Sequence, residues 1–116
     1  MATEIATIVP LVEGVSVTSS EVTIYTVPAS TKAVVKFISI CNEHASTSET
    51  VTIWFVPTGQ TTALAYKRYV LTVFPSSPVD IDCAHVLNAD TDIVVDGVTG
   101  GISSISISGM TITNAS

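Results

Sequence analysis

The sequence is poor in charged side chains. Lys, Arg, Asp and Glu make up 12% of its 116 residues, about half of the roughly 25% that is usual in globular domains. The only cations are Lys32, Lys36, Lys67 and Arg68, and the formal net charge is −6. Because binding to a phosphate backbone depends on clustered Lys and Arg, we expect no nucleic-acid partner.

Long apolar runs and a secretory signal are also missing. No run approaches the roughly 18 apolar residues of a membrane-spanning helix, so we expect no membrane partner. The first four residues lack the basic and apolar regions of a signal peptide, which predicts synthesis and folding in the cytoplasm. The mean hydropathy is nevertheless +0.57. We therefore expect apolar surface that is buried between subunits.

Cysteine is scarce, with Cys41 and Cys83 as the only two. Two cysteines do not make a disulfide framework in a chain of this size, and cytosolic thiols usually stay reduced. We expect both thiols to be free.

The sequence has no recognisable catalytic set. His44 and His85 are the only histidines, and neither stands beside a nucleophile or a carboxylate pair in a known motif. His44 lies in a polar loop between two strong strands, where an exposed histidine is the ordinary outcome. We therefore predict no enzymatic activity, no catalytic residue and no cofactor.

His85 follows Asp80, Asp82 and Cys83, a grouping that invites a zinc site. Strand alternation puts the two aspartates on one face and the cysteine on the other, and the four-ligand set is incomplete. We expect no metal there.

Asp90 and Asp92 have the spacing that opens a calcium loop. Val94 then occupies the next ligand position, and no Glu closes the loop. A turn followed by a strand explains this segment, and weak calcium binding remains the alternative. The glycines at 97, 100 and 101 predict a turn between strands, because no helix follows them.

Helical periodicity is absent, and short β-branched runs alternate with turn residues along the whole chain. Helix is expected at most as one short turn within residues 58–65. The sequence predicts a single all-β domain over residues 1–116, an antiparallel, jelly-roll-like β-sandwich of eight or nine strands. Residues 1–10 are expected to form an N-terminal arm or an edge strand. The expected strands are residues 4–9, 15–18, 22–27, 32–41, 50–56, 66–74, 79–83, 91–95 and 102–113.

Two of these strands carry further detail. In residues 32–41 both alternating sets are largely apolar, which predicts a strand covered on two sides. In the last strand, Ile105 and Ile107 alternate with serines, whereas Ile112 lies at a position of the opposite alternation. This change predicts a β-bulge near Gly109.

One group of side chains has the composition of a protein interface. Trp54 and Phe55 are adjacent on one strand, so they face opposite ways and at least one enters the core. The other is expected under the rim of the second sheet or at a subunit contact. The next strand concentrates tyrosines and cations, which is typical either of an interface or of a solvated strand. The candidate interface residues are Trp54, Phe55, Tyr66, Lys67, Arg68 and Tyr69.

The order of several short elements resembles small virion proteins of tailed bacteriophages. These elements are tyrosine-threonine-valine-proline at 25–28, a hydrophobic strand ending in Asn42, and valine-proline-x-glycine at 56–59. Leucine-asparagine-alanine at 87–89 and a closing strand at 105–112 complete the series. The resemblance covers most of the chain from Glu21 onward.

This resemblance implies a non-enzymatic structural component of a phage virion, made in the host cytoplasm. It points to a capsid decoration (cement) protein that stabilises the shell, with the major capsid protein or other virion proteins as partners. It also implies self-association, as a homotrimer. If so, residues 1–10 are the part expected to reach a neighbouring subunit.

A tail-associated or fibre-associated module that binds a carbohydrate or receptor is the alternative. Sandwiches of this size host such sites, with aromatic side chains on a rim beside acidic residues. Trp54, Tyr66 and Tyr69, together with Asp90 and Asp92, are the residues that would supply one.

Overall fold

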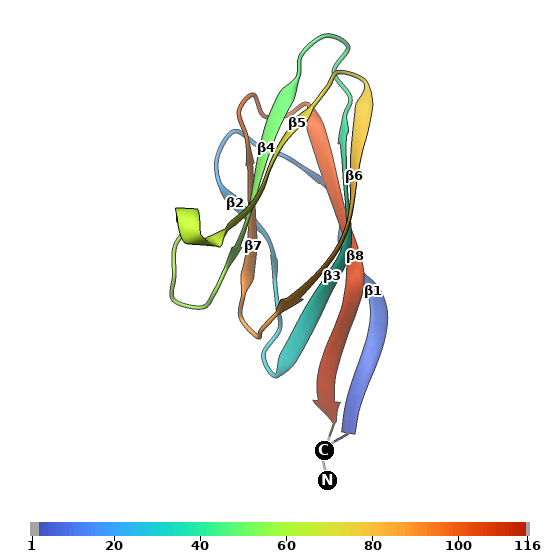
Figure 1. The fold of residues 1–116 in the computed structure, drawn as a ribbon, viewed down its shortest axis with the longest axis vertical. Coiled ribbons are helices and arrows are strands. Elements are labelled where there is room, and N and C mark those ends of the chain that lie inside the picture. The colour runs from blue at the N-terminus through green and yellow to red at the C-terminus, as the bar shows by residue number, and fades with distance from the viewer. Residues whose placement is uncertain (1–2, 116) are drawn as a thin grey trace.

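The computed structural model describes residues 3–115, which form two four-stranded antiparallel sheets packed face to face (Figure 1). We call them sheet A and sheet B. In order across each sheet, sheet A contains β1 (Thr3–Ser16), β8 (Ser103–Ala115), β3 (Thr31–Asn42) and β6 (Ser77–Leu87), and sheet B contains β2 (Val22–Thr26), β7 (Asp92–Gly97), β4 (Glu49–Val56) and β5 (Lys67–Val73). This is the strand order of a jelly roll, which confirms the predicted fold class.

The strand count is eight. The run expected at residues 15–18 is not a separate strand, because Val15 and Ser16 are the last residues of β1. The helix content of the described residues is one 3-10 turn, η1 (Leu64–Tyr66). None of the helical structure within residues 3–115 is long and apolar enough to cross a membrane.

β-Branched side chains fill the space between the sheets. Val and Ile favour the pleated backbone, and each fully buried one contributes roughly 1.5–3 kcal/mol of transfer free energy. Ile38, Ile53, Ile93 and Ile107 are fully buried at the centre. The residues around them in the same core are Val12, Val17, Val27, Ala33, Val35, Ile40, Val51, Phe55, Val73, Leu87, Val95 and Ile105.

The prediction for residues 32–41 assumed a strict alternation of faces, which a bulge in β3 interrupts. Its register against β8 shifts between Val35 and Phe37, so Lys36 is an extra residue. Beyond the bulge the inward positions change parity, from Val35 to Ile38. A strict period of two therefore mixed the two faces, and the outer face of β3 carries lysines and serine as well as apolar side chains.

The expected bulge near Gly109 is present, but its extra residue lies on the neighbouring strand. Val35 pairs with Gly109 and Phe37 pairs with Ser108. A Cβ atom on Gly109 would stand 1.8 Å from the carbonyl oxygen of Val34. Glycine is required at 109 because the bulged β3 backbone presses against it.

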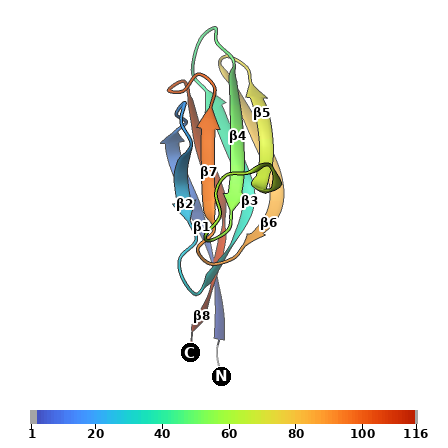
Figure 2. The ribbon, with the colours of Figure 1, turned by 90° about the vertical axis from the view of Figure 1, so that its left-hand side faces the viewer.

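The sandwich is elongated, with principal extents of 56 × 27 × 18 Å. At one end β1 and β8 extend past sheet B, and their terminal pairs, Thr3 with Ala115 and Glu4 with Asn114, form a short two-stranded ribbon beyond the last pair of β3 with β8 (Figures 1 and 2). Residues 3–10 thus belong to β1, the edge strand of sheet A. The ribbon places one end of sheet A where sheet B does not cover it.

Candidate binding cleft beside β5 and β6

The six candidate interface residues do not form one surface. Trp54, Tyr66 and Lys67 lie on the outer side of sheet B. Phe55 enters the core, Tyr69 points between the sheets, and Arg68 lines a cleft with Phe55. Sheet B separates the two sets.

Trp54 is covered by its own chain. It is 8% exposed and packs with Val56, Val94 and Tyr66 in a small second cluster. The Lys67 ammonium lies 5.8 Å from the centre of its ring, within the range of a cation–π contact. The chain's own residues, and not the rim of sheet A, cover the outward aromatic.

The cover is the segment between β4 and β5, residues 57–66, which crosses the outside of sheet B (Figure 2). The Thr62 hydroxyl donates to both carboxylate oxygens of Glu21, just before β2, and this contact ties the segment down. Tyr66, at its end, supplies the aromatic contact to the second cluster.

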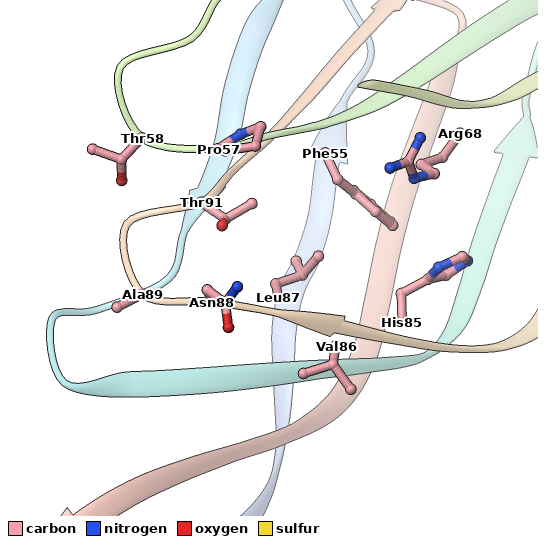
Figure 3. A pocket seen from close by; sticks show the side chains of 10 residues that line it. All are labelled: Phe55, Pro57, Thr58, Arg68, His85, Val86, Leu87, Asn88, Ala89 and Thr91. Carbon is pink, nitrogen blue, oxygen red and sulfur yellow. The ribbon is translucent and has the colours of Figure 1, made fainter. Parts of the chain in front are cut away.

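A cleft of about 430 Å³ opens on the side of the sandwich where β5 and β6 are the edge strands (Figure 3). Its lining comes from the end of β4, the start of β5, the end of β6 and the turn before β7. The lining residues are Phe55, Pro57, Thr58, Arg68, His85, Val86, Leu87, Asn88, Ala89 and Thr91.

A second bulge brings Arg68 to this cleft. Ile53 pairs with Tyr69 while Trp54 pairs with Lys67, so Arg68 is the extra residue of β5. The Arg68 side chain lies at the same end of the cleft as His85 (Figure 3). Nη1 of Arg68 donates to the carbonyl oxygens of Ala65, at 3.1 Å, and Lys67, at 3.3 Å.

His85 is a polar group in an otherwise aromatic environment. Its Nε2 lies 2.7 Å from the hydroxyl oxygen of Tyr69. The ring meets Phe55 edge to face, with 5.1 Å between the ring centres. Burial, and then the positive charge of Arg68, lower the pKa of His85. The imidazole is therefore neutral at pH 7.

Cys83, next to this group, is not an activated nucleophile. Burial raises the pKa of its thiol, and the sulfur lies 3.5 Å from the carbonyl oxygen of Val35. Burial and then Cys83 itself raise the pKa of Tyr69. A thiol with a raised pKa stays protonated at neutral pH, and the protonated form is a poor nucleophile.

Both cysteines are free thiols on opposite faces of sheet A. Cys41 is exposed, and Cys83 faces the core. The acidic residues near Cys83 lie on the outer face, where Asp80 accepts a hydrogen bond from Ser39 at 2.8 Å. Within residues 3–115, no group of three or more His, Cys, Asp or Glu side chains is placed to hold a metal ion.

The aromatic rim of the carbohydrate-binding alternative does not assemble. Trp54 and Tyr66 pack outside sheet B, whereas Tyr69 points inward towards His85. Asp92 accepts a hydrogen bond from Thr26 at 2.6 Å, and Asp90 occupies a turn with a φ of 64°. Asp92 pairs with Val56 on the outer face of sheet B, where Trp54 and Tyr66 also lie, but Tyr69 points inward and Asp90 lies in the turn before β7, so the five residues do not form one rim.

A row of apolar side chains crosses the outer face of sheet A, and the sequence analysis had predicted an apolar outer face only for residues 32–41. Ile8 pairs with Met110, Met110 with Val34, and Val34 with Val86, so the row crosses all four strands. Ile8 is 86% exposed and Val86 is 65% exposed. We call these four residues the apolar row. Only the register of strands distant in sequence brings them together.

No protein-family model matches the sequence, and no curated protein matches it in a sequence comparison. Among solved structures, the chain is similar to a protein of the Bacillus endospore appendages, described as a novel family of disulfide-linked pili. The TM-score is 0.54 at 17% identity, and the match covers 97% of this chain and 88% of that one.

The chain is also similar to a chain of infectious bursal disease virus, Gx strain, with a TM-score of 0.51 at 9% identity. That match covers 95% of this chain and 32% of the viral chain. At these identities the likeness shows the shared all-β sandwich fold. Neither protein is from a tailed phage, so the phage resemblance stays a prediction.

Proposed function

We propose that this protein is a non-enzymatic structural subunit of a multi-copy assembly. In the specific form of the proposal, the assembly is a phage virion and the protein is a capsid decoration (cement) protein. The apolar row is the observation that carries the proposal. Contiguous exposed apolar side chains are uncommon on monomeric proteins and mark contact surfaces. Here they span the full width of sheet A, from Ile8 to Val86.

The surroundings of the row support a specific contact surface. On the same face, the strand ends away from the ribbon carry polar side chains, with Ser39 paired to both Ser106 and Asp80. An apolar area bordered by polar residues is the usual composition of a protein interface. The low charge content of the chain agrees with burial of such surface between copies.

The similar structures support the general class. One belongs to pili of Bacillus endospores and the other to a virus particle, so this fold occurs in components of large assemblies. The phage virion, the major capsid protein as partner and the homotrimer come from the sequence resemblance. These three points make the proposal more specific than the fold alone does.

The first test is the mass of the protein in solution, measured by light scattering. We expect a multiple of 12.1 kDa, with a trimer as the specific expectation. Val34→Lys puts a charge in the apolar row and should weaken association roughly 100-fold. Ser106→Lys adds the same charge on the polar part of the same face and should leave the mass unchanged. A monomeric wild type, or equal effects of the two variants, contradicts the proposal.

The second test concerns the virion. The purified protein should co-sediment with phage shells that lack it, and Val34→Lys should reduce this binding while far-UV circular dichroism still reports sheet. If an assembling protein fails to bind any capsid or tail component, the structural role survives and the decoration role does not.

A further inference from the structure

The cleft beside β5 and β6 has an apolar middle between two polar ends (Figure 3). Phe55 and Leu87 lie in the middle, 4% and 5% exposed. Arg68 and His85 lie at one end. At the other end are Thr58, Asn88 and Thr91. A volume of about 430 Å³ is within the range of small-ligand sites, roughly 300–1,000 Å³.

Arg68 is held in place with donors to spare. A guanidinium has five N–H groups, and the hydrogen bonds that Arg68 forms with the described residues engage Nη1 alone. Both partners are carbonyl oxygens, which fix the group without neutralising its charge. Nη2 and Nε remain to form the paired hydrogen bonds that a carboxylate accepts.

The charge at this end of the cleft is therefore that of Arg68. His85 is neutral, and its neighbour Tyr69 is protonated. The chain as a whole carries a net charge of −6 with four cations. A single positive group beside an apolar wall selects a single negative group joined to an apolar body.

We propose that this cleft binds a carboxylate attached to an apolar group, with the carboxylate on Arg68 and the apolar group against Phe55 and Leu87. The carboxylate has two possible sources, a free organic acid or the acidic side chain of a neighbouring subunit. The site does not depend on the proposed virion role, because its occupation can be measured on the isolated protein.

Phenylacetate is a suitable probe, and 2-phenylacetamide is its uncharged counterpart of nearly equal shape. Titration of the ¹⁵N-labelled protein should give saturable amide shifts at Phe55, Thr58, Arg68 and His85 with phenylacetate. The amide should bind about tenfold more weakly, because a charge-assisted pair of hydrogen bonds is lost.

Two variants with the same change in net charge test the role of Arg68. Arg68→Gln should weaken phenylacetate binding about tenfold or more, whereas Lys36→Gln, on the outer bulge of β3, should leave binding unchanged. If Arg68→Gln does not fold, Arg68→Lys is the second variant, because it keeps the charge but loses the paired hydrogen bonds. Its affinity for phenylacetate should be lower than that of the wild type without being abolished.

Light scattering with saturating phenylacetate separates the two sources. A fall in mass identifies a neighbouring subunit as the natural donor, and an unchanged mass identifies a free acid. The proposal is overturned if phenylacetate gives no saturable shifts, if the amide binds equally well, or if binding to the folded Arg68 variant equals that of the wild type.

Discussion

Two fully buried polar side chains, Asn42 and Glu49, hold the loops at one end of the sandwich. Asn42 donates through Nδ2 to the carbonyl oxygens of Thr47 and Val73. Glu49 accepts hydrogen bonds from the backbone N–H groups of Thr99 and Gly100, both at 2.8 Å. A buried polar group is tolerated only when such partners satisfy it.

Glu49→Ala should destabilise the protein by about 2–3 kcal/mol, because two backbone donors lose their acceptor and a space opens beside Gly97. The free energy of unfolding in urea measures the effect. Glu43→Ala, at an exposed position of the preceding loop, is the control and should stay within about 0.5 kcal/mol of wild type. Equal effects would show that the Glu49 contacts contribute nothing.

His85 should make stability fall as the pH drops below neutral. Its pKa is lowered in the folded state, by burial first and by Arg68 second. The unfolded chain, with an ordinary histidine pKa of about 6.5, therefore binds the proton more readily. Stability is complete above that value and decreases as the pH falls through it.

Thermal unfolding at pH 7 and pH 5 measures this loss. His85→Gln should show a smaller drop in Tm between the two pH values than wild type, because glutamine does not titrate. A pH dependence that is identical in His85→Gln and wild type would exclude His85 as its source.

At the level of elements, the bulge in β3 fixes how sheet A is assembled. Gly109→Ala forces a methyl group against the Val34 carbonyl oxygen, where the available distance is 1.8 Å. We expect a loss of about 3 kcal/mol or failure to fold, since β3 and β8 must separate. Urea unfolding checks this, with exposed Ser108→Ala on the same strand as the control. A stable Gly109→Ala protein would mean that the bulge can move.

The strands could be predicted from the sequence because their pattern is local. Seven of the nine expected runs correspond to β2 through β8, and the remaining two are the ends of β1. The sequence did not predict correctly which face of a strand each side chain occupies, or which side chains from different strands are in contact. The extra residues Lys36 and Arg68 change the parity of β3 and β5, and no local signal marks them, since both are ordinary strand residues.

The cleft and the apolar row were missed for the same reason. His85 was considered only as a catalytic base or a metal ligand, from its neighbours in sequence, whereas its neighbours in space are Phe55 and Tyr69. The apolar row joins residues from four strands whose register depends on the bulges. Composition predicted that such surface exists and the pattern of residues 32–41 placed part of it on β3, but the row across four strands could not be derived from the sequence.

At the scale of the whole molecule, the two outer faces differ in what covers them. On sheet B, residues 57–66 lie over Trp54 and its cluster. On sheet A, Ile8 and Val86 remain largely exposed. A charge placed at the outward aromatic would therefore disturb the fold, and a charge placed on the outer face of sheet A would disturb association.

Trp54→Ala tests this division of roles. Removing a ring that is 8% exposed and packed against Val94 and Tyr66 should cost about 3 kcal/mol of folding free energy. The mass in light scattering should not change, because the chain's own residues already cover the ring. Thr52→Ala, an outward position on the same strand, controls for loss of side-chain volume outside the cluster.

Val34→Lys should behave in the opposite way, with a lower mass and a nearly unchanged unfolding free energy at matched protein concentration. If Trp54→Ala dissociates the oligomer while keeping its stability, the contact surface lies on sheet B and residues 57–66 do not shield it.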